Sequence, residues 1–345
     1  MLPGDRLGPM RAPGESPLRY LSAADVAEAM PPLSERIRLA ERTLTALVAD
    51  AELPPKIGVH PRQAGSFAHA MPAHLRGPDP TGTADLLGIK WVAGFPANRG
   101  RALPAIHGLV LLTDPLTGIP SAILDAGPIT AERTAAISGV AIARFVPAVT
   151  GRPLRVAVLG AGVQGRSHLA VLGHLLPGVE LTIFDRHPDR ADALASTAEG
   201  TVGIATARTA LTAREATSEA DVVVSAASFA AADQRQTLTD DWLPPDALIV
   251  AVDYATYVAA SVARTASLFV VDHREQFLAS RDAGSFDGYP DPTTTLGEAI
   301  VEERRRPQHG RVVVTHLGVG LADLVFGEAI VRRAEGLGLG TLLPR

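Results

Sequence analysis

The spacing of apolar residues predicts a helix near the start of the chain and a sheet after it. From Ser22 to about Asp50, apolar residues recur at helical intervals, and "SAAD" offers a capping box between Ser22 and Asp25. From about Ile57 to Leu124, short β-forming runs ("IGVH", "GIKWVAGF", "HGLVLLTD", "PSAILDAG") alternate with turn signals such as "DPLTG". This second segment therefore predicts a mostly antiparallel sheet with hairpin connections.

A different pattern begins at Leu154. The runs "LRVAVLG", "ELTIFD", "DVVVSAA", "ALIVAVD" and "LFVVD" are short and continuously apolar, as strands of a parallel sheet buried on both faces are. Helical segments lie between most of them, and a further helix, "GLADLVFGEAIVRRAEGLGLG", is expected to pack back on the first domain. The predicted fold class is α/β, with a Rossmann-type doubly wound parallel sheet plus a mostly antiparallel α+β domain.

Charge and composition exclude several classes of function. The net charge is −5 and hydrophobic residues make up 46% of the 345 residues, which indicates a folded protein without a basic face for nucleic acid. The chain has no cysteine, which excludes disulfides, zinc–thiolate sites and a thiol nucleophile. Its apolar runs are too short to span a bilayer and its N-terminus lacks a signal peptide, so we expect no membrane partner and a cytoplasmic location.

A dinucleotide-binding motif follows the first strand of the predicted parallel sheet. In "VAVLGAGVQGRSHL", the pattern G-x-G-x-x-G falls on Gly160, Gly162 and Gly165, between a predicted strand and a predicted helix. We expect the first glycine to permit the tight turn, the second to let the backbone approach a pyrophosphate, and the third to allow close helix–strand packing. Together with Val163 and Gln164, these residues are predicted to hold the cofactor at the helix N-terminus.

The ends of two further strands predict the rest of the cofactor site. "ELTIFD" ends in Asp185, whose carboxylate is expected to accept hydrogen bonds from ribose hydroxyls and to repel a 2′-phosphate. NAD is therefore favoured, although Arg186 could stack on adenine or make NADP possible. Ser225 and Ala226, in "DVVVSAA", are further predicted cofactor contacts. The alternative is a Rossmann-like domain that binds another nucleotide or none.

Basic side chains in the first domain form a second candidate site. Lys90 stands in the middle of the apolar strand "GIKWVAGF", where an unpaired ammonium is costly or loses its proton. Lys56 in "PPKIGVH", His69 in "FAHAMPAHL" and Arg133 in "TAERTAAISG" also interrupt apolar stretches. Three cations in one cleft would bind a carboxylate. Each residue also has a structural interpretation, as an exposed edge-strand lysine, a solvated first-turn arginine or a satisfied core histidine.

The order of these motifs resembles the ornithine cyclodeaminase/mu-crystallin family. The similarity covers nearly the whole chain, from about Leu21 to the C-terminus. It is most specific between Gly88 and Gly165, where "GIKWVAGFP", "DPLTG", "TAERTAA" and "GAGVQG" follow one another. The resemblance implies an enzyme with a nicotinamide dinucleotide cofactor and a small amino or imino acid substrate.

The resemblance also implies roles for individual residues. In the family, three basic groups hold the substrate carboxylate, and these match Lys56, Lys90 and Arg133. The general acid/base aspartate matches Asp253, although "YATY" replaces the Pro-Gly segment that usually follows it. Subunits of the family pair through the first domain, which implies a homodimer. The implied division is 1–130, completed by 317–345, for substrate binding and dimerisation, and 131–316 for NAD(P) binding.

The substrate is less well determined than the reaction type. Ornithine cyclodeaminases carry a glutamate where this chain has His69, and commonly a Lys-Ser pair where it has Thr315-His316. A diamino acid needs a carboxylate near its distal ammonium, so the presence of His69 in place of the glutamate weakens strict ornithine specificity. We predict catalytic roles for His69 and Lys90 besides Asp253, and a substrate contact for His316, since an imidazole titrates near working pH.

The residues together predict hydride transfer at the α-carbon of an amino acid or its imine, with no metal. Cyclodeamination of a diamino acid such as ornithine or lysine is the first interpretation. A ketimine or imine reductase is an alternative. An opine-type amino acid dehydrogenase is another, because the long gap before "GIKW" is similar to that branch of the family. The last alternative is a mu-crystallin-like binding protein without turnover.

Overall fold

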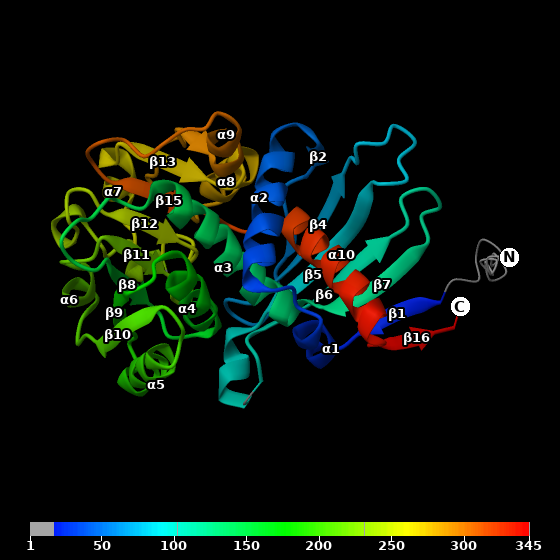
Figure 1. Ribbon diagram of the computed structural model, residues 1–345, viewed down its shortest axis with the longest axis horizontal. Helices are drawn as coiled ribbons and strands as arrows, with labels where there is room; N and C mark the ends of the chain where they lie inside the picture. Colours follow the sequence, from blue (N-terminus) through cyan, green and yellow to red (C-terminus); the bar gives the residue numbers. More distant parts are fainter. Residues whose placement is uncertain (1–16, 102, 231, 345) are drawn as a thin grey trace, which may run out of the picture.

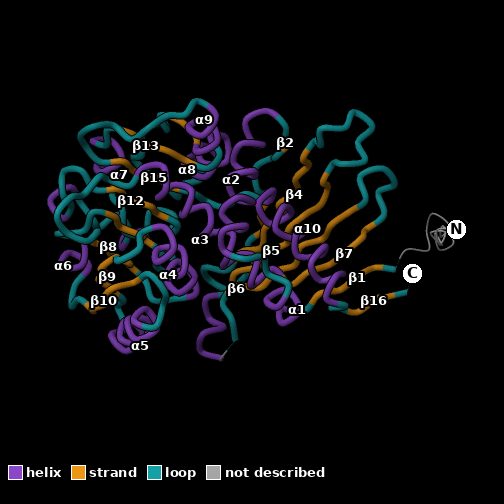
Figure 2. The backbone as a smooth tube through the Cα atoms, in the orientation of Figure 1, coloured by secondary structure: helices purple, strands orange, loops and turns teal. Residues whose placement is uncertain are grey.

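The computed structural model describes residues 17–101, 103–230 and 232–344 and arranges them in two sheets that lie beside each other (Figure 1). One sheet is mostly antiparallel, and in the other the paired strands are parallel. Figure 2 shows how the helices gather around both sheets, with long hairpin loops extending from the ends of the antiparallel strands. The predicted α/β fold class, with two sheets of different type, is confirmed.

The antiparallel sheet has the order β16-β1-β7-β6-β5-β4-β2, and β3 also pairs with β4. The β1–β7 pair is parallel, and the other pairs are antiparallel. β1 and β16 bring the two ends of the described chain together at one edge. The strands are β1 (Leu18–Leu21), β2 (Ala51–Glu52), β3 (Ile57–Val59), β4 (Phe67–Leu75), β5 (Leu86–Gly94), β6 (Ile106–Thr113), β7 (Pro120–Asp125) and β16 (Thr341–Leu343).

Helices cover one face of this sheet. The C-terminal helix lies across the strands in Figure 1, as predicted, and packs so closely that a Cβ on Gly88 of β5 would stand 3.1 Å from Leu324. A 20-residue helix separates the two sheets and is buried along most of its length, so one apolar core runs from the first sheet into the second. These helices are α1 (Ala23–Glu28), α2 (Leu33–Ala49), α3 (Ala126–Phe145) and α10 (Gly320–Leu337).

The parallel sheet has the order β10-β9-β8-β11-β12-β15-β13-β14. The strand order reverses between β8 and β11, and such a switch point opens a crevice at the carboxyl ends of the strands. Its strands are β8 (Arg155–Leu159), β9 (Val179–Phe184), β10 (Ile204–Thr209), β11 (Val222–Ser225), β12 (Leu248–Ala251), β13 (Leu268–Val271), β14 (Thr294–Thr295) and β15 (Val312–Thr315). Its helices are α4 (Val163–Leu175), α5 (Pro188–Glu199), α6 (Ala213–Thr217), α7 (Ala260–Thr265), α8 (Arg274–Asp282) and α9 (Leu296–Val301), with short 3-10 turns at Pro96–Arg101, Ala232–Gln234 and Asp240–Trp242.

The N-terminal helical segment differs from its prediction. The capping box is present, with Ser22 and Asp25 bonding each other's backbone N–H groups, but α1 ends at Glu28. A second helix, α2, begins only at Leu33. The break coincides with the Pro31-Pro32 pair, because a proline disfavours the helical conformation of the residue before it. Where the sequence predicts one helix, the chain therefore forms two.

Of the helices in the described ranges, none is both long and apolar enough to cross a membrane.

Candidate active site

Lys90 has an internal counter-ion. It lies in the middle of β5 on the face that α10 covers, and its side chain is 1% exposed. Its Nζ donates to Asp323 Oδ1 at 2.7 Å and to Thr130 Oγ1 at 2.7 Å. Asp323 is in the first turn of α10 and also accepts from Arg133 Nε at 3.3 Å. The ammonium that interrupts the apolar strand is thus paired with a carboxylate that the sequence analysis did not single out.

Burial and charge act against each other in this group. Burial lowers the pKa of Lys90 to about 8, although the carboxylate of Asp323 opposes the shift. Burial alone would raise the pKa of Asp323, but Arg133 and Lys90 together hold it below its ordinary value. We therefore take Asp323 as ionised at neutral pH, with two cations sharing one of its oxygens.

Lys56 is held by the loop that follows β15. Its Nζ donates to Tyr254 Oη at 2.7 Å and to the carbonyl of Leu317 at 2.9 Å. Burial lowers the pKa of Lys56 to about 8, against the attraction of Asp272, whose carboxylate accepts from the backbone N–H groups of Leu317 and Gly318. Lys56 is therefore not the exposed edge-strand lysine of the structural interpretation.

The three predicted cations converge. The charge of Arg133 contributes to lowering the pKa of both Lys56 and Lys90, and Lys56 also acts on Lys90. Arg133 is buried near the start of α3, and a Cβ on Gly318 would stand 2.2 Å from its Nη1. The loop after β15 thus contacts both Lys56 and Arg133. We call Lys56, Lys90 and Arg133 the cation cluster.

His69 adjoins this cluster. In the β4–β5 ladder, His69 pairs with Val92 and Met71 with Lys90, so His69 and Lys90 point to the same face of the sheet. The imidazole stacks on Phe67 at a centroid distance of 4.6 Å. Burial, and then the charge of Lys56, lower the pKa of His69 to about 4. His69 is therefore neutral at neutral pH and has a cationic neighbour.

Asp253 lies at the carboxyl end of the parallel sheet, just after β12. It is buried, its Oδ2 accepts from Ser225 Oγ at 2.5 Å, and its Oδ1 has no hydrogen-bond partner among the residues that the structure describes. Burial raises the pKa of Asp253 to about 6. The next two residues, Tyr254 and Ala255, have φ angles of 53° and 59°, which are strained for residues with a Cβ and are typical of functional sites. No helix starts at Asp253, so its carboxylate does not cap a helix.

The glycine-rich turn has the geometry that a bound pyrophosphate requires. Gly160 has φ 107°, and a Cβ there would stand 2.6 Å from the carbonyl oxygen of Ala226. A Cβ on Gly165 would stand 2.0 Å from the carbonyl oxygen of Gly160. Gly162 caps α4 without a side-chain hydrogen bond, and the space beside it is open. The first N–H groups of α4 are therefore accessible to a phosphate.

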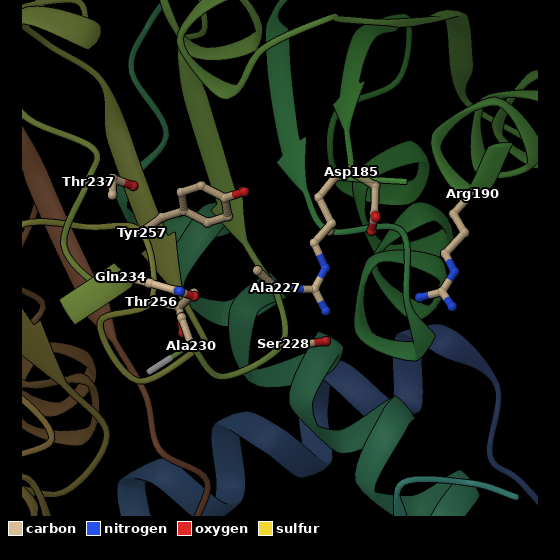
Figure 3. Close-up of a pocket in the computed structure, with 11 residues that line it drawn as sticks. Asp185, Arg190, Ala227, Ser228, Ala230, Gln234, Thr237, Thr256 and Tyr257 are labelled. Carbon is tan, nitrogen blue, oxygen red and sulfur yellow. The ribbon is translucent and has the colours of Figure 1, made fainter. Parts of the chain in front are cut away.

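The predicted ribose contact lies in a cavity of about 260 Å³ beside this turn (Figure 3). Asp185 and Arg190 stand on one side of it, and Gln234, Thr256 and Tyr257 on the other. Asp185 Oδ2 accepts from the N–H of Ala161 at 2.8 Å, which ties the second strand to the glycine-rich turn. The remaining lining residues are Gly160, Arg186, Ala227, Ser228, Ala230 and Thr237.

The other predicted cofactor contacts of this region, Val163, Gln164, Ser225 and Ala226, do not line this cavity. Val163 is the first residue of α4 and is exposed. Gln164 donates to the carbonyl of Thr130 at 3.4 Å, and its buried Oε1 has no hydrogen-bond partner in the described ranges of the chain. Ser225 instead donates from its hydroxyl to Asp253. In place of Ala226, Ala227 and Ser228 line the cavity.

His316 lies directly after β15 and is buried. Its Nε2 is 2.8 Å from Ser138 Oγ on α3, and the charge of Arg133 contributes to its pKa, which burial holds well below the ordinary value. Sequence reasoning missed Asp323, Tyr254 and Ser138. Asp323 had a usable signal, because it stands among the apolar residues of "GLADLVF", where an unpaired carboxylate would be as costly as an unpaired Lys90.

The chain is similar to known proteins over nearly its whole length. The model of the ornithine cyclodeaminase/mu-crystallin family matches residues 21–334. The nodulation efficiency protein NfeD of Rhizobium meliloti is 33% identical, over 95% of this chain and 99% of its own. The ketimine reductase mu-crystallin of Mus musculus is 29% identical, over 76% of this chain and 79% of its own.

A solved structure shares the fold. It is that of the Δ1-pyrroline-2-carboxylate reductase of Thermococcus litoralis, in complex with NADH and L-proline. It superposes with a TM-score of 0.80 over 94% of this chain and all of its own, at 24% identity. The extent of the family match and the 33% identity to a full-length relative leave one conclusion: this chain belongs to the ornithine cyclodeaminase/mu-crystallin family.

Proposed function

We propose that this protein is an NAD-dependent enzyme that transfers hydride at the α-carbon of an α-imino acid, reducing it to the α-amino acid. The observation that carries the proposal is the position of the cation cluster. Lys90 and Arg133 are buried, and Lys56 donates to Tyr254 and Leu317, in the loops that follow β12 and β15 at the carboxyl end of the parallel sheet. Cations there can hold the substrate carboxylate, and Asp253 is then close to the α-carbon and its nitrogen.

NAD is the cofactor that fits the crevice. The open side of Gly162 and the accessible N–H groups of α4 suit a pyrophosphate, and Asp185 adds a carboxylate where the adenosine ribose is expected. The partnerless Gln164 Oε1 and Asp253 Oδ1 are acceptors at the nicotinamide end. When bound, the dinucleotide supplies or accepts the hydride.

The residues of this chain supply the rest of the reaction. Lys56, Lys90 and Arg133 bind the substrate carboxylate and fix the α-carbon. In the reductive direction the imine carbon gains a hydride and its nitrogen gains a proton, so imine, reduced cofactor and one proton give amine and oxidised cofactor. Asp253 can supply this proton, since its pKa of about 6 keeps both protonation states accessible near neutrality.

The surroundings of His69 favour a ketimine over a diamino acid. A diamino acid carries a distal ammonium, which requires a carboxylate or a neutral polar pocket. At the position where ornithine cyclodeaminases have a glutamate, this chain has a neutral imidazole next to Lys56, with Phe67 stacked on it. We therefore favour imine reduction over cyclodeamination. Cyclodeamination is the second candidate, because the same cation cluster and Asp253 would also serve that reaction.

The experiment that separates these functions measures two signals. Cyclic ketimines such as Δ1-pyrroline-2-carboxylate are mixed with NADH, and NADH consumption is followed by absorbance. L-ornithine or L-lysine is mixed with catalytic NAD, and released ammonia is measured. NADH consumption supports the reductase. Ammonia without net NADH supports the cyclodeaminase. Tight ligand binding without either signal across a panel of amino and imino acids supports a binding protein and overturns the proposal.

We also propose that two copies of the chain pair through the uncovered face of the antiparallel sheet. A row of cross-strand neighbours, Ile57, Ala70, Trp91 and Leu109, lies on the face opposite α10. The side chains of Ile57, Trp91 and Leu109 are 65%, 46% and 43% exposed. Contiguous apolar surface of this kind marks an interaction site. Sedimentation of wild type and Trp91→Glu tests the proposal: a wild-type monomer would refute it, and a monomeric variant of a dimeric wild type would support it.

A further inference from the structure

Three buried side chains form a hydrogen-bonded chain beneath the proposed active site. His168 Nδ1 on α4 lies 2.6 Å from the carbonyl oxygen of Gln164. His168 Nε2 lies 2.8 Å from Ser138 Oγ on α3, and Ser138 Oγ lies 2.8 Å from His316 Nε2. All three side chains are at least nine-tenths buried. This chain therefore runs from the backbone of α4 to the end of β15.

The direction of every hydrogen bond in this chain follows from one fixed acceptor. The carbonyl of Gln164 can only accept, so His168 Nδ1 carries a proton. His168 is buried and neutral, since burial lowers its pKa to about 4, so its Nε2 has a free lone pair. Ser138 must then donate to His168, and Ser138 Oγ must accept from His316 Nε2. His316 is likewise neutral, because burial holds its pKa well below the ordinary value. Its Nδ1 is consequently left as an acceptor.

That acceptor has no partner, although it is buried. Nδ1 of His316 is one of the buried polar atoms without a hydrogen bond in the described part of the chain. The others include Asp253 Oδ1, Gln164 Oε1 and Thr315 Oγ1, which come from the ends of β12 and β15 and the start of α4. The carboxyl ends of β12 and β15 are neighbours in the parallel sheet, at the edge where the nicotinamide and the substrate are expected to meet. A buried acceptor without a donor is costly, so its retention here indicates a ligand that brings N–H groups.

Of the two N–H groups that could reach His316, the substrate nitrogen is favoured. The α-nitrogen is bonded to the carbon that carries the carboxylate, so it must lie close to the cation cluster. Arg133 is near enough to His316 for its charge to affect the imidazole. The loop from His316 to Gly318 also runs directly past the guanidinium of Arg133 and the ammonium of Lys56. The carboxamide of the nicotinamide is the other candidate.

We infer that His316 is a positioning residue whose Nδ1, fixed as an acceptor by Ser138 and His168, takes a hydrogen bond from the substrate α-nitrogen. The donor is the N–H that this nitrogen carries once it is protonated, in the iminium and in the amine product, because a neutral cyclic imine has no N–H. This inference rests on the proposed function. It assigns His316 a neutral role, in contrast to the acid/base role that a histidine near an active site suggests. The proton of the reaction then comes from another group, such as Asp253.

Two isosteric variants test the role. A glutamine places its amide near the position of the imidazole Nε2 and keeps the contact to Ser138, whereas an asparagine places its amide near Nδ1. We expect His316→Gln to lower kcat/KM for the imine about 10- to 100-fold, the range of a lost charge-assisted hydrogen bond. His316→Asn should retain clearly more activity than His316→Gln. Thermal unfolding of both variants shows whether either has failed to fold, and equal activity of wild type and a folded His316→Gln overturns the inference.

Cofactor binding shows whether the substrate nitrogen or the nicotinamide carboxamide donates to His316. If the substrate nitrogen is the donor, the dissociation constant of NADH in the absence of substrate is the same for wild type and His316→Gln. If the nicotinamide carboxamide is the donor, NADH binds more weakly to the variant. In that case the acetylpyridine analogue of NADH, which lacks the amide N–H, abolishes the difference between the two proteins. Either of these last results overturns the assignment to the substrate.

Nitrogen NMR tests the role of His316 independently of whether the protein reduces imines. The chemical shifts of the histidine ring nitrogens report which one carries the proton, whether or not the enzyme turns over. We expect the proton of His316 on Nε2, and a shift of the Nδ1 resonance when L-proline is added with NAD. Ser138→Ala should move His316 toward a mixture of tautomers. A proton on Nδ1 in the wild type overturns the inference even if imine reduction is observed. Absence of turnover with the expected tautomer instead refutes the proposed function.

Discussion

Lys90 Nζ and Asp323 Oδ1 lie 2.7 Å apart, and neither side chain is more than 1% exposed. The ion pair joins the middle of β5 to the first turn of α10 and positions the ammonium before any substrate arrives. Two of the three N–H groups of Lys90 are used by Asp323 and Thr130, and Arg133 donates to the same carboxylate through its Nε. The remaining donors are available to a substrate carboxylate. Asp323 therefore orients Lys90 and Arg133, while the net charge of the cation cluster stays positive.

Replacing Asp323 by asparagine should destabilise the protein strongly. The variant leaves Lys90 and Arg133 buried without their shared carboxylate, and breaking a buried pair in this way costs about 3–5 kcal/mol. We expect this loss in the free energy of unfolding, measured by urea denaturation. The pKa of Lys90 should also fall below that of the wild type, because the opposing attraction of Asp323 is gone.

A surface pair provides the control for this variant. Asp241 accepts from Arg214 at 2.8 Å, and both side chains are largely exposed. Asp241→Asn makes the same chemical change and should cost less than about 1 kcal/mol, as exposed ion pairs do. Equal costs for the two variants would mean that Asp323 does not compensate buried charge.

Replacing Asp253 by asparagine should change how stability depends on pH. The folded-state pKa of Asp253 is about 6, above its ordinary value of 3.8, so between these values the folded protein binds more protons than the unfolded chain. Stability contributed by this group is then full at low pH and falls as the pH rises from about 4 to 6, by up to about 3 kcal/mol. Asp253→Asn cannot ionise. Its stability relative to the wild type should therefore rise over this window.

Thermal unfolding at pH 4.5 and pH 7.5 measures this difference. Other titrating groups are common to the two proteins, so they cancel when the variant is compared with the wild type at each pH. The same variant should lose most imine reduction at neutral pH, because an amide supplies no proton. A constant difference in stability across this range would show that Asp253 is not a buried acid with a raised pKa.

The dinucleotide turn could be predicted from the sequence because local chemistry determines it. A continuous apolar strand, three spaced glycines and a helix with an acidic residue after the next strand are all features of neighbouring residues. The structure forms β8, the turn and α4 in that order, with Gly160 in a conformation that favours glycine. Sequence patterns of this kind carry their own geometry.

β4 was not predicted as a strand, because its sequence lacks a clear alternation. "FAHAMPAHL" contains two histidines and Pro72, which is unfavourable within a sheet. The segment becomes a strand because β5 pairs along its whole length. On its other edge, β3 pairs at Ala68–Ala70 and β2 at His74–Leu75, so Pro72 falls in the gap between them. Tertiary pairing therefore determines this strand.

The pairing of Lys90 with Asp323 could not be predicted for a related reason. The two residues are 233 positions apart, and they meet only because α10 returns to the face of the first sheet. The sequence indicated that Lys90 needed a partner and that the C-terminal helix would pack on the first domain. It contained no local signal for the register in which that helix contacts β5.

Replacing Asp185 by serine should weaken the preference for NAD over NADP. The carboxylate lies in the cavity next to the glycine-rich turn, where a 2′-phosphate would be repelled, and Arg186 and Arg190 line the same cavity. Without the carboxylate, these guanidinium groups can attract the phosphate. We expect the ratio of kcat/KM for NADH to that for NADPH to fall at least about 10-fold, from one lost hydrogen bond and one lost repulsion.

Asp192→Ser is a control for this exchange, because Asp192 is an exposed residue of α5 that does not line the cavity. It should leave the NADH to NADPH ratio unchanged. If Asp185→Ser also leaves the ratio unchanged, the ribose does not lie beside Asp185. The bond from Ala161 to Asp185 makes some loss of affinity for both cofactors expected, so the ratio is the informative quantity.

Adding one methyl group at Gly318 should disrupt the cation cluster. Gly318 has φ 78°, and its Cβ would stand 2.2 Å from Arg133 Nη1, so the guanidinium must move. We expect Gly318→Ala to raise KM for the imine by at least about 10-fold, from misplacement of one charge-assisted hydrogen bond, while NADH binding changes little.

Gly118→Ala is a matched control, because Gly118 has φ 73° but open space around its Cβ. Both variants carry the backbone strain of alanine at positive φ, about 1 kcal/mol, which unfolding experiments can compare. A rise in KM for Gly318→Ala alone therefore reports the contact with Arg133. Equal KM values for the two variants would mean that Arg133 does not bind the substrate carboxylate.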